Sequence, residues 1–317
     1  MIKAKIFADT RKMTRDEWLE ARRNGIGGSD ASAILGLNPY SSPLRIYLDK
    51  IGKGDEPETN EAMRQGTDLE EYVAKRFTEE TGKKVKKCNK ILQSFDRPFM
   101  LANVDRLIVG EDAGLECKTT SPFSKFKFEE GEINPHYYWQ SVHYMAVTGA
   151  KKWYVAVLVL GKAFHVFEVA RNEDEINKLV VAEFDFWHQH VMKKVPPLPT
   201  GNDVDDEAVA ALYPAGDVER DDILDMTGLE DSLNLRDFKA RQRDQLDAEI
   251  KAIDQDLKLS LGTFQRGLCG DWKVNWTNTS TSRIDTAALK KKYPQIAQEV
   301  TKTTTGRRFS VAKIKEV

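Results

Sequence analysis

Three residues on two neighbouring apolar segments have the types and spacing of a divalent-cation site. Asp105 lies within FMLANVDRLIVG, and Glu116 and Lys118 lie in GLECKTT shortly after it. A lone carboxylate within an apolar strand is costly to desolvate, which favours a functional role for Asp105. Residues two apart on a strand point to one face, so Glu116 and Lys118 would converge. Carboxylate oxygens suit Mg²⁺ or Mn²⁺, and a lysine supplies a compact charge beside a phosphate or an attacking water.

The same residues have a plainer interpretation, which is a salt bridge between Glu116 and Lys118. An acid, one spacer and a lysine occur by chance in most chains of this size, so that pair alone is weak evidence. The preceding Asp105 and the surrounding strand pattern favour the metal site.

A third acid lies upstream, in the helical pattern GTDLEEYVAKRF. Glu70 shares a helical face with the apolar residues at i+3, i+4 and i+7, which should be buried. Glu71 is expected on the opposite face, paired with Lys75 in solvent. Thr67 and Glu70 also have the spacing of a capping box, in which Glu70 would only bind a backbone N–H. We predict that Glu70 is the inward acid, with capping as the alternative.

Composition limits the remaining possibilities. The chain has 317 residues, 40% hydrophobic and 31% charged, which is typical of a soluble globular protein. Its start lacks the apolar core of a signal peptide, and its longest apolar run, 153–160, is too short to span a bilayer. The three cysteines, Cys88, Cys117 and Cys269, include no C-x-x-C pair. They favour a reducing compartment and argue against a disulfide framework, a zinc site or an iron–sulfur site.

The net charge of −2 conceals a segregation of charge along the chain. Residues 201–231 hold eleven acids and one arginine, whereas residues 232–317 hold seventeen bases and ten acids. A polyanion partner is therefore compatible with the near-neutral total. The alternative is a solvated acidic linker beside ordinary surfaces.

The pattern predicts an α/β protein with two modules. Helices are expected over 16–23, 31–35, 67–81, 137–148 and 173–191, and strands over 99–109, 114–119, 153–160 and 163–169. Residues 1–198 form the main domain, which ends at KKVPPLPT, and residues 199–232 form an acidic linker. Residues 233–317 contain an amphipathic arm (235–261), short strands near 272–276, a helix capped by Asp285 and a final strand, RRFSVAKI.

Four blocks of sequence occur in an order that resembles a known family. They are RNGIGGSDASAILGLNPY, GTDLEEYV, the Asp105…Glu-Cys-Lys pair and YYWQSVHYMAVTG. This arrangement resembles the YqaJ family of viral recombinases, which is similar to the lambda-type phage exonucleases. The resemblance covers about residues 15–195, and RIDTAALKKKYP…GRRFSV also looks like the tail of longer YqaJ members. It implies the restriction-endonuclease-like PD-(D/E)XK fold, a central mixed sheet flanked by helices, with a small C-terminal α+β module.

The resemblance also implies roles for individual residues. Asp105, Glu116 and the Cys117 backbone carbonyl would be metal ligands for Mg²⁺ or Mn²⁺, with two ions expected. Lys118 would orient or deprotonate the attacking water, and Glu70 would complete the acidic cluster. The other implied residues are Gln140, supporting Lys118 or the water, and Arg23 and Ser29, binding a 5′ phosphate near NGIGGSD. Relatives with an iron–sulfur centre carry a cysteine cluster, which this chain lacks.

The function implied by the resemblance is a 5′→3′ exonuclease on linear double-stranded DNA in the cytoplasm of a bacterial host. It would leave 3′ single strands for a phage annealing protein and would form a homo-oligomer, by resemblance a trimeric ring. The alternatives are a structure- or sequence-specific endonuclease and an inactive DNA-binding recombination scaffold. In the C-terminal module, Arg307 and Arg308 are candidate DNA contacts. Its amphipathic arm would instead bind a protein partner or another subunit.

Overall fold

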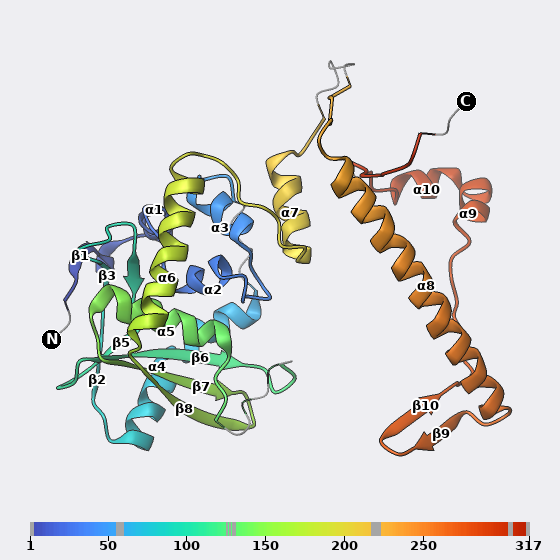
Figure 1. Cartoon of the computed structure of the whole chain (residues 1–317). Helices are drawn as coiled ribbons and strands as arrows, with labels where there is room; N and C mark the ends of the chain where they lie inside the picture. The colour runs from blue at the N-terminus through green and yellow to red at the C-terminus, as the bar shows by residue number, and fades with distance from the viewer. Residues whose placement is uncertain are drawn as a thin grey trace. The chain divides into compact units, whose positions relative to one another are not determined.

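The chain divides into two compact units, Met1–Pro214 and Ala215–Val317 (Figure 1). The computed structural model describes residues 3–54, 60–124, 126, 128, 131–216, 223–303 and 307–314. Among the described residues, no helix is both long enough and apolar enough to cross a membrane.

The first unit is built on a mixed five-stranded sheet. Its strand order is β2 (Val85–Lys87), β5 (Arg106–Ile108), β6 (Ala113–Thr120), β7 (Lys152–Val159) and β8 (Ala163–Ala170). Strands β6 and β7 are parallel and the other pairs are antiparallel. A parallel pair needs a long crossover, which here contains helix α5 (Pro135–Thr148). The predicted α/β class, with a central mixed sheet flanked by helices, is confirmed.

The first unit also contains a second sheet, which has three strands. It contains β1 (Lys5–Asp9), β3 (Lys90–Gln93) and β4 (Leu101–Asn103), all antiparallel. The single strand expected over 99–109 is wrong, because the chain leaves one sheet after Asn103 and enters the other at Arg106. Asp105 therefore lies at the junction of the two sheets rather than within a strand.

Helices cover both faces of the central sheet. Helix α4 (Glu61–Thr81) packs Val73, Ala74 and Phe77 into one cluster with Leu115 of β6. On the other face, Tyr137 of α5 packs with Val155 and Val157 of β7. Since neighbouring strand residues point to opposite faces, these clusters define an α4 face and an α5 face. The remaining helices of this unit are η1 (Thr10–Lys12), α1 (Arg15–Arg23), α2 (Gly28–Ile34), α3 (Pro43–Lys50), α6 (Glu173–Asp185), the π-helix η2 (Phe186–Val191) and α7 (Asp203–Leu212).

A buried ion pair connects α5, α6 and β4. His143 Nδ1 lies 2.7 Å from Glu183 Oε1, and Nε2 of the same ring lies 2.8 Å from the Leu101 carbonyl oxygen. Both side chains are fully buried. Burial lowers the pKa of His143, but the adjacent Glu183 carboxylate outweighs it, so the pKa is raised overall. Burial also raises the pKa of Glu183, so the two groups share a proton between them, and their contacts fix β4 against the helices.

Helix α7 lies within the expected acidic linker. It contacts α3, and its Asp205 carboxylate accepts hydrogen bonds from the Thr200 backbone N–H and hydroxyl at 2.6 and 2.7 Å. The sequence predicts that these residues form a linker, but their contacts place them in the first unit. The division into compact units falls after Pro214 rather than after residue 198.

The second unit begins with a long helix, α8 (Glu230–Leu261), followed by the hairpin β9 (Arg266–Cys269) and β10 (Trp272–Asn275). Helix α9 (Thr286–Lys292) is capped by Asp285, as the sequence predicts, and α10 (Pro294–Glu299) follows. The final strand expected over 307–314 is wrong: its described residues have no strand pairing. They lie beside α8 instead, where Lys313 forms an ion pair with Asp237 at 3.4 Å.

Candidate active site

The carboxylate of Asp105 is tied to β6 by a backbone hydrogen bond. The Cys117 N–H donates to Asp105 Oδ2 at 2.8 Å. Asp105 has left the β4 ladder and has not yet entered β5, and this contact ties its carboxylate to the strand that carries Glu116 and Lys118. The structure therefore brings Asp105 to β6, as the spacing in the sequence predicts.

Glu116 is buried on the α5 face and receives two donors on one oxygen. Lys118 Nζ and Gln140 Nε2 each lie 2.7 Å from Glu116 Oε1. Gln140 Nε2 also donates to the Tyr144 hydroxyl at 2.9 Å. The salt bridge between Glu116 and Lys118 is thus present, and it forms part of a larger polar cluster. Gln140 supports Glu116 directly rather than Lys118.

The two acids of this cluster repel one another electrostatically. Burial and the neighbouring Glu116 carboxylate raise the pKa of Asp105 well above its ordinary value. Burial lowers the pKa of Lys118, but Glu116 and Asp105 outweigh it and raise that pKa overall. Lys118 therefore remains an ammonium ion, which favours orienting a group or stabilising charge over deprotonating water.

The donor set fits a divalent cation. Glu116 Oε2 is buried and has no hydrogen-bond partner among the described residues, although a buried carboxylate oxygen normally has one. A hard cation would satisfy this oxygen and relieve the repulsion between Glu116 and Asp105. Among the described residues there is no group of three or more His, Cys, Asp or Glu side chains arranged as a metal site.

Glu70 lies next to this cluster, where its charge adds to the raised pKa of Asp105, and its role as a metal ligand stays a prediction. Its Oε1 accepts a hydrogen bond from Arg106 Nη1 at 2.5 Å, on the α4 face of the sheet. The capping alternative is wrong, because α4 begins at Glu61 with Asn60 as its N-cap, and Thr67 lies inside the helix. The expected pair of Glu71 with Lys75 is likewise not formed.

Glu71 and Lys75 each have other partners: those of Glu71 lie on strands, and that of Lys75 lies on the same helix. Glu71 binds Arg106 and Lys87, each at 3.0 Å, and Lys75 lies 3.8 Å from Glu79. Hydrogen bonding from Lys87 and the charge of Arg106 lower the pKa of Glu71. Arg106 was not singled out from the sequence, although its position directly after Asp105 offered a signal.

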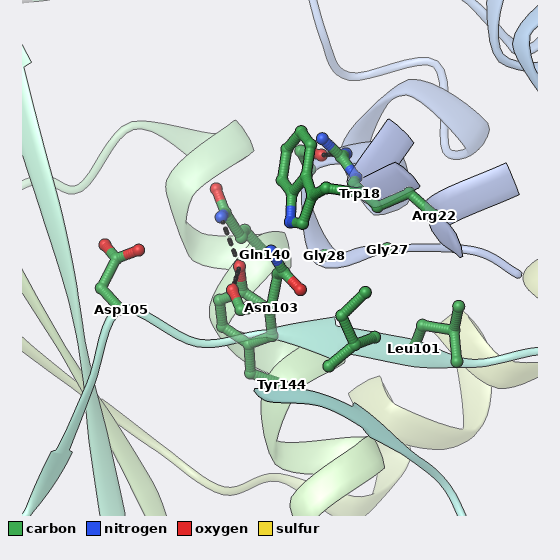
Figure 2. A pocket seen from close by; sticks show the side chains of 11 residues that line it. Trp18, Arg22, Gly27, Gly28, Leu101, Asn103, Asp105, Gln140 and Tyr144 are labelled. Carbon is green, nitrogen blue, oxygen red and sulfur yellow. Dashed lines mark hydrogen bonds between the residues drawn. The ribbon is translucent and has the colours of Figure 1, made fainter. Parts of the chain in front are cut away.

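A cavity of about 220 Å³ lies next to the acidic cluster (Figure 2). Asp105, Gln140 and Tyr144 line it on one side, and Trp18 and Arg22 on the other. The remaining lining residues are Gly27, Gly28, Ser29, Ile91, Leu101 and Asn103. The cavity thus has an acidic part and a basic part.

The cation of this cavity is Arg22. Arg22 Nη2 donates to Ser29 Oγ at 2.9 Å, and its guanidinium lies 4.7 Å from the centre of the Trp18 ring. Of the two residues predicted to bind a 5′ phosphate, Ser29 lines the cavity and Arg23 does not. Arg23 is one position further along the helix and therefore points in another direction. It lies 3.1 Å from Glu20 and 3.8 Å from Asp49.

Gly28 is required where α2 approaches α5. A Cβ atom at this position would lie 2.6 Å from Tyr144 Cε1 and 3.1 Å from Gln140 Cγ. The glycines of NGIGGSD therefore permit a close helix contact, in addition to any contact with a ligand. This contact sets the position of Gln140 and Tyr144 relative to Ser29.

The candidate DNA contacts of the C-terminal module belong to the second unit. Arg307 and Arg308 are exposed, in the second unit and outside regular secondary structure.

The fold and site define a mixed α/β protein in which two carboxylates and a lysine converge beside a polar cavity. Comparison with known proteins identifies the family. A model of the YqaJ-like viral recombinase domain matches residues 17–151. Over 316 residues the chain is 36% identical to the uncharacterized protein YqaJ of Bacillus subtilis (strain 168), with 98% of each chain covered. The chain belongs to the YqaJ family.

More distant similarities extend to viral and bacterial proteins. Protein D345L of African swine fever virus is 36% identical over 75 residues, which are 24% of this chain and 21% of that protein. An alkaline exonuclease from Laribacter hongkongensis is 18% identical with a TM-score of 0.48, covering 62% of this chain and all of its own. A phage-related exonuclease from Haemophilus somnus 129PT is 13% identical with a TM-score of 0.41, covering 54% of this chain and 96% of its own.

We predict that Asp105→Asn stabilises the metal-free protein at neutral pH. Folding raises the pKa of Asp105, so the folded state holds this proton more tightly and stability falls as pH rises from the unfolded value through the folded one. An amide lacks this cost and still accepts the Cys117 N–H. Melting temperature measured in a chelator should rise by about 2 to 4 °C.

Glu168→Gln is the matched control. The pKa of Glu168 is lowered, first by its hydrogen bond with Tyr154, so its carboxylate is favoured by folding. This variant should melt no higher than the wild type. An Asp105→Asn protein that melts lower at neutral pH than the wild type would contradict the assigned electrostatics.

Proposed function

We propose that the protein is a divalent-metal-dependent exonuclease that degrades linear double-stranded DNA from 5′ to 3′ and leaves 3′ single strands for recombination by annealing. The observation that carries the proposal is the convergence of Asp105, Glu116 and Lys118 beside a cavity that also contains Arg22. Membership of a viral recombinase family supports the substrate class.

In this proposal, Asp105, Glu116 and the Cys117 carbonyl hold Mg²⁺ or Mn²⁺. A bound cation of this kind supplies an activated water and stabilises charge on the phosphate. Gln140 donates to Glu116 Oε1, which leaves Oε2 for the ion. Lys118, as an ammonium ion, neutralises charge next to the scissile phosphate.

The basic part of the cavity suits a terminal phosphate. Arg22 offers a guanidinium whose geometry matches phosphate oxygens, and Ser29 adds a hydroxyl. We therefore assign 5′-phosphate binding to Ser29 with Arg22, in place of the Arg23 expected from the sequence. A DNA end bound here would place its first linkage toward Asp105, because both residues line one cavity.

We predict that Glu116→Gln abolishes hydrolysis of a linear duplex with Mg²⁺ while DNA binding is retained. The amide keeps the size of the side chain but removes a charge needed to hold the cation, so loss of about a thousandfold or more is expected. An end-labelled duplex reports polarity, and a closed circle of the same sequence serves as the second substrate.

Each outcome of that assay has a defined meaning. Rapid cutting of the closed circle by the wild type would establish the alternative of an endonuclease. A wild type that binds DNA and cuts neither substrate would establish an inactive scaffold. A Glu116→Gln protein as fast as the wild type would show that the site is wrongly assigned.

We predict that Arg22→Gln weakens discrimination between 5′-phosphorylated and 5′-hydroxyl ends. Loss of a charge-assisted contact with phosphate should raise KM for the phosphorylated end about tenfold or more, with little effect on the 5′-hydroxyl end. Arg23→Gln is the matched control, because Arg23 binds Glu20 and Asp49. Equal effects of the two substitutions on both ends would refute the assignment of Arg22.

For the second unit we propose binding of a protein partner, the single-strand annealing protein of the same recombination system. Leu246, Ile250, Ile253 and Leu257 form an exposed apolar stripe on α8. Such a stripe at helical spacing is a protein-facing feature. Arg307 and Arg308 remain proposed DNA contacts, and a ring-shaped trimer is proposed for the assembly.

We predict that the double substitution Ile250→Asp with Ile253→Asp in the full chain weakens binding of the purified annealing protein at least about tenfold, because it places charges on the apolar stripe. Leu259→Asp is the control, since Leu259 is 81% exposed and lies on the other side of α8. Calorimetric titration measures both. Unchanged binding by the double variant would place the partner elsewhere.

A further inference from the structure

The side chain of Arg106 is 3% exposed, and it lies next to the acidic cluster. Nη1 donates to Glu70 Oε1 at 2.5 Å and to the Asp105 carbonyl oxygen at 2.9 Å. Nη2 donates to Glu71 Oε2 at 3.0 Å. A buried guanidinium in this arrangement needs its carboxylates, because removing a partner leaves an uncompensated charge.

The strand register separates this ion pair from Glu116. Arg106 of β5 is opposite Leu115 of β6, and Leu115 packs against α4. Glu116, the next residue, therefore points to the α5 face, where it binds Gln140. Glu70 on α4 and Glu116 on β6 thus approach the junction at Asp105 from opposite faces of the sheet.

Charge is already balanced on the α4 face. Glu70 and Glu71 share the Arg106 guanidinium, and Glu71 also binds Lys87. On the α5 face, Lys118 is the cation beside the two acids Asp105 and Glu116. Its charge is already compensated by these acids, so it needs no third acid. Glu116 Oε2 is the buried carboxylate oxygen of this cluster that lacks a hydrogen-bond partner among the described residues.

We propose that Arg106 removes Glu70 from the metal-binding set, so that the DNA-free protein binds one divalent cation, on Asp105 and Glu116. Arg106 is a positioning residue that occupies the side of Asp105 where a second cation with a Glu70 ligand would lie. The inference rests on the proposed metal site, and it replaces the two ions and the Glu70 ligand expected from the sequence.

The test is a titration of the full-length protein with Mn²⁺, followed by calorimetry and electron paramagnetic resonance. One ion per chain is expected beyond the level bound by the Asp105→Asn variant, with a spectrum free of coupling between manganese ions. Asp105→Asn should lose this ion, by more than about a hundredfold in affinity.

Glu70→Gln separates a structural role from a ligand role. It should lower the melting temperature, since it leaves Arg106 short of a carboxylate, but keep one ion with an affinity within about threefold of wild type. Glu71→Gln is the matched control, because Glu71 contacts the same guanidinium and is 71% exposed. It should change neither the ion count nor the affinity.

Two manganese ions with a coupled spectrum in the wild type would overturn the proposal, as would loss of an ion in Glu70→Gln. The wild-type measurement decides the matter even if that variant does not fold. Failure of the nuclease proposal is recognised separately, by a Glu116→Gln protein that still cuts DNA, whereas a second ion in an active enzyme refutes only the role of Arg106.

Discussion

The hydrogen bond from the Cys117 N–H to Asp105 determines how the rest of the site is assembled. Asp105 stands between two sheets, where its carbonyl oxygen accepts from the Cys88 N–H and Arg106 Nη1, and the 2.8 Å contact with Cys117 ties its carboxylate to β6. The donor is the residue between Glu116 and Lys118, so one short strand segment supplies the contact and both neighbouring functional side chains. Any shift in the register of β6 would move all of them together.

The site is costly to fold, because two acids are buried close together, and other buried ion pairs lie in its surroundings. Asp105 and Glu116 repel one another, whereas His143 with Glu183 and Lys50 with Asp30 are paired at 2.7 and 2.8 Å. These pairs lie in the walls that carry the site: His143 binds the Leu101 carbonyl, and Asp30 accepts the Gly27 N–H. Removing one partner from such a pair is strongly destabilising. Loss of either pair would therefore disturb the walls that hold the acids.

Sequence reasoning predicted the elements more reliably than the partners of charged residues. The spacing of Glu116 and Lys118 determines a shared face on any strand, and β6 has that geometry. Glu70 could not be assigned in this way, because its partner Arg106 is 36 residues away and the pairing depends on how α4 crosses the sheet. The final strand failed for a related reason: RRFSVAKI has a strand pattern, but a strand also needs a neighbour with free backbone groups.

The difference between Arg22 and Arg23 shows how one helical step decides the function of a charge. Trp18 and Arg22 are four residues apart and lie on one face of α1, so the indole ring supports the guanidinium that reaches Ser29. Lys50 lies 3.4 Å from the Arg22 carbonyl oxygen and 2.8 Å from Asp30, whose other oxygen is 4.0 Å from the Arg22 guanidinium. The end of α1 and the glycine turn are thus connected through one buried cation. In the proposed function, this connection fixes the separation between the phosphate-binding guanidinium and Asp105, and with it the linkage at which an incoming DNA end is cut.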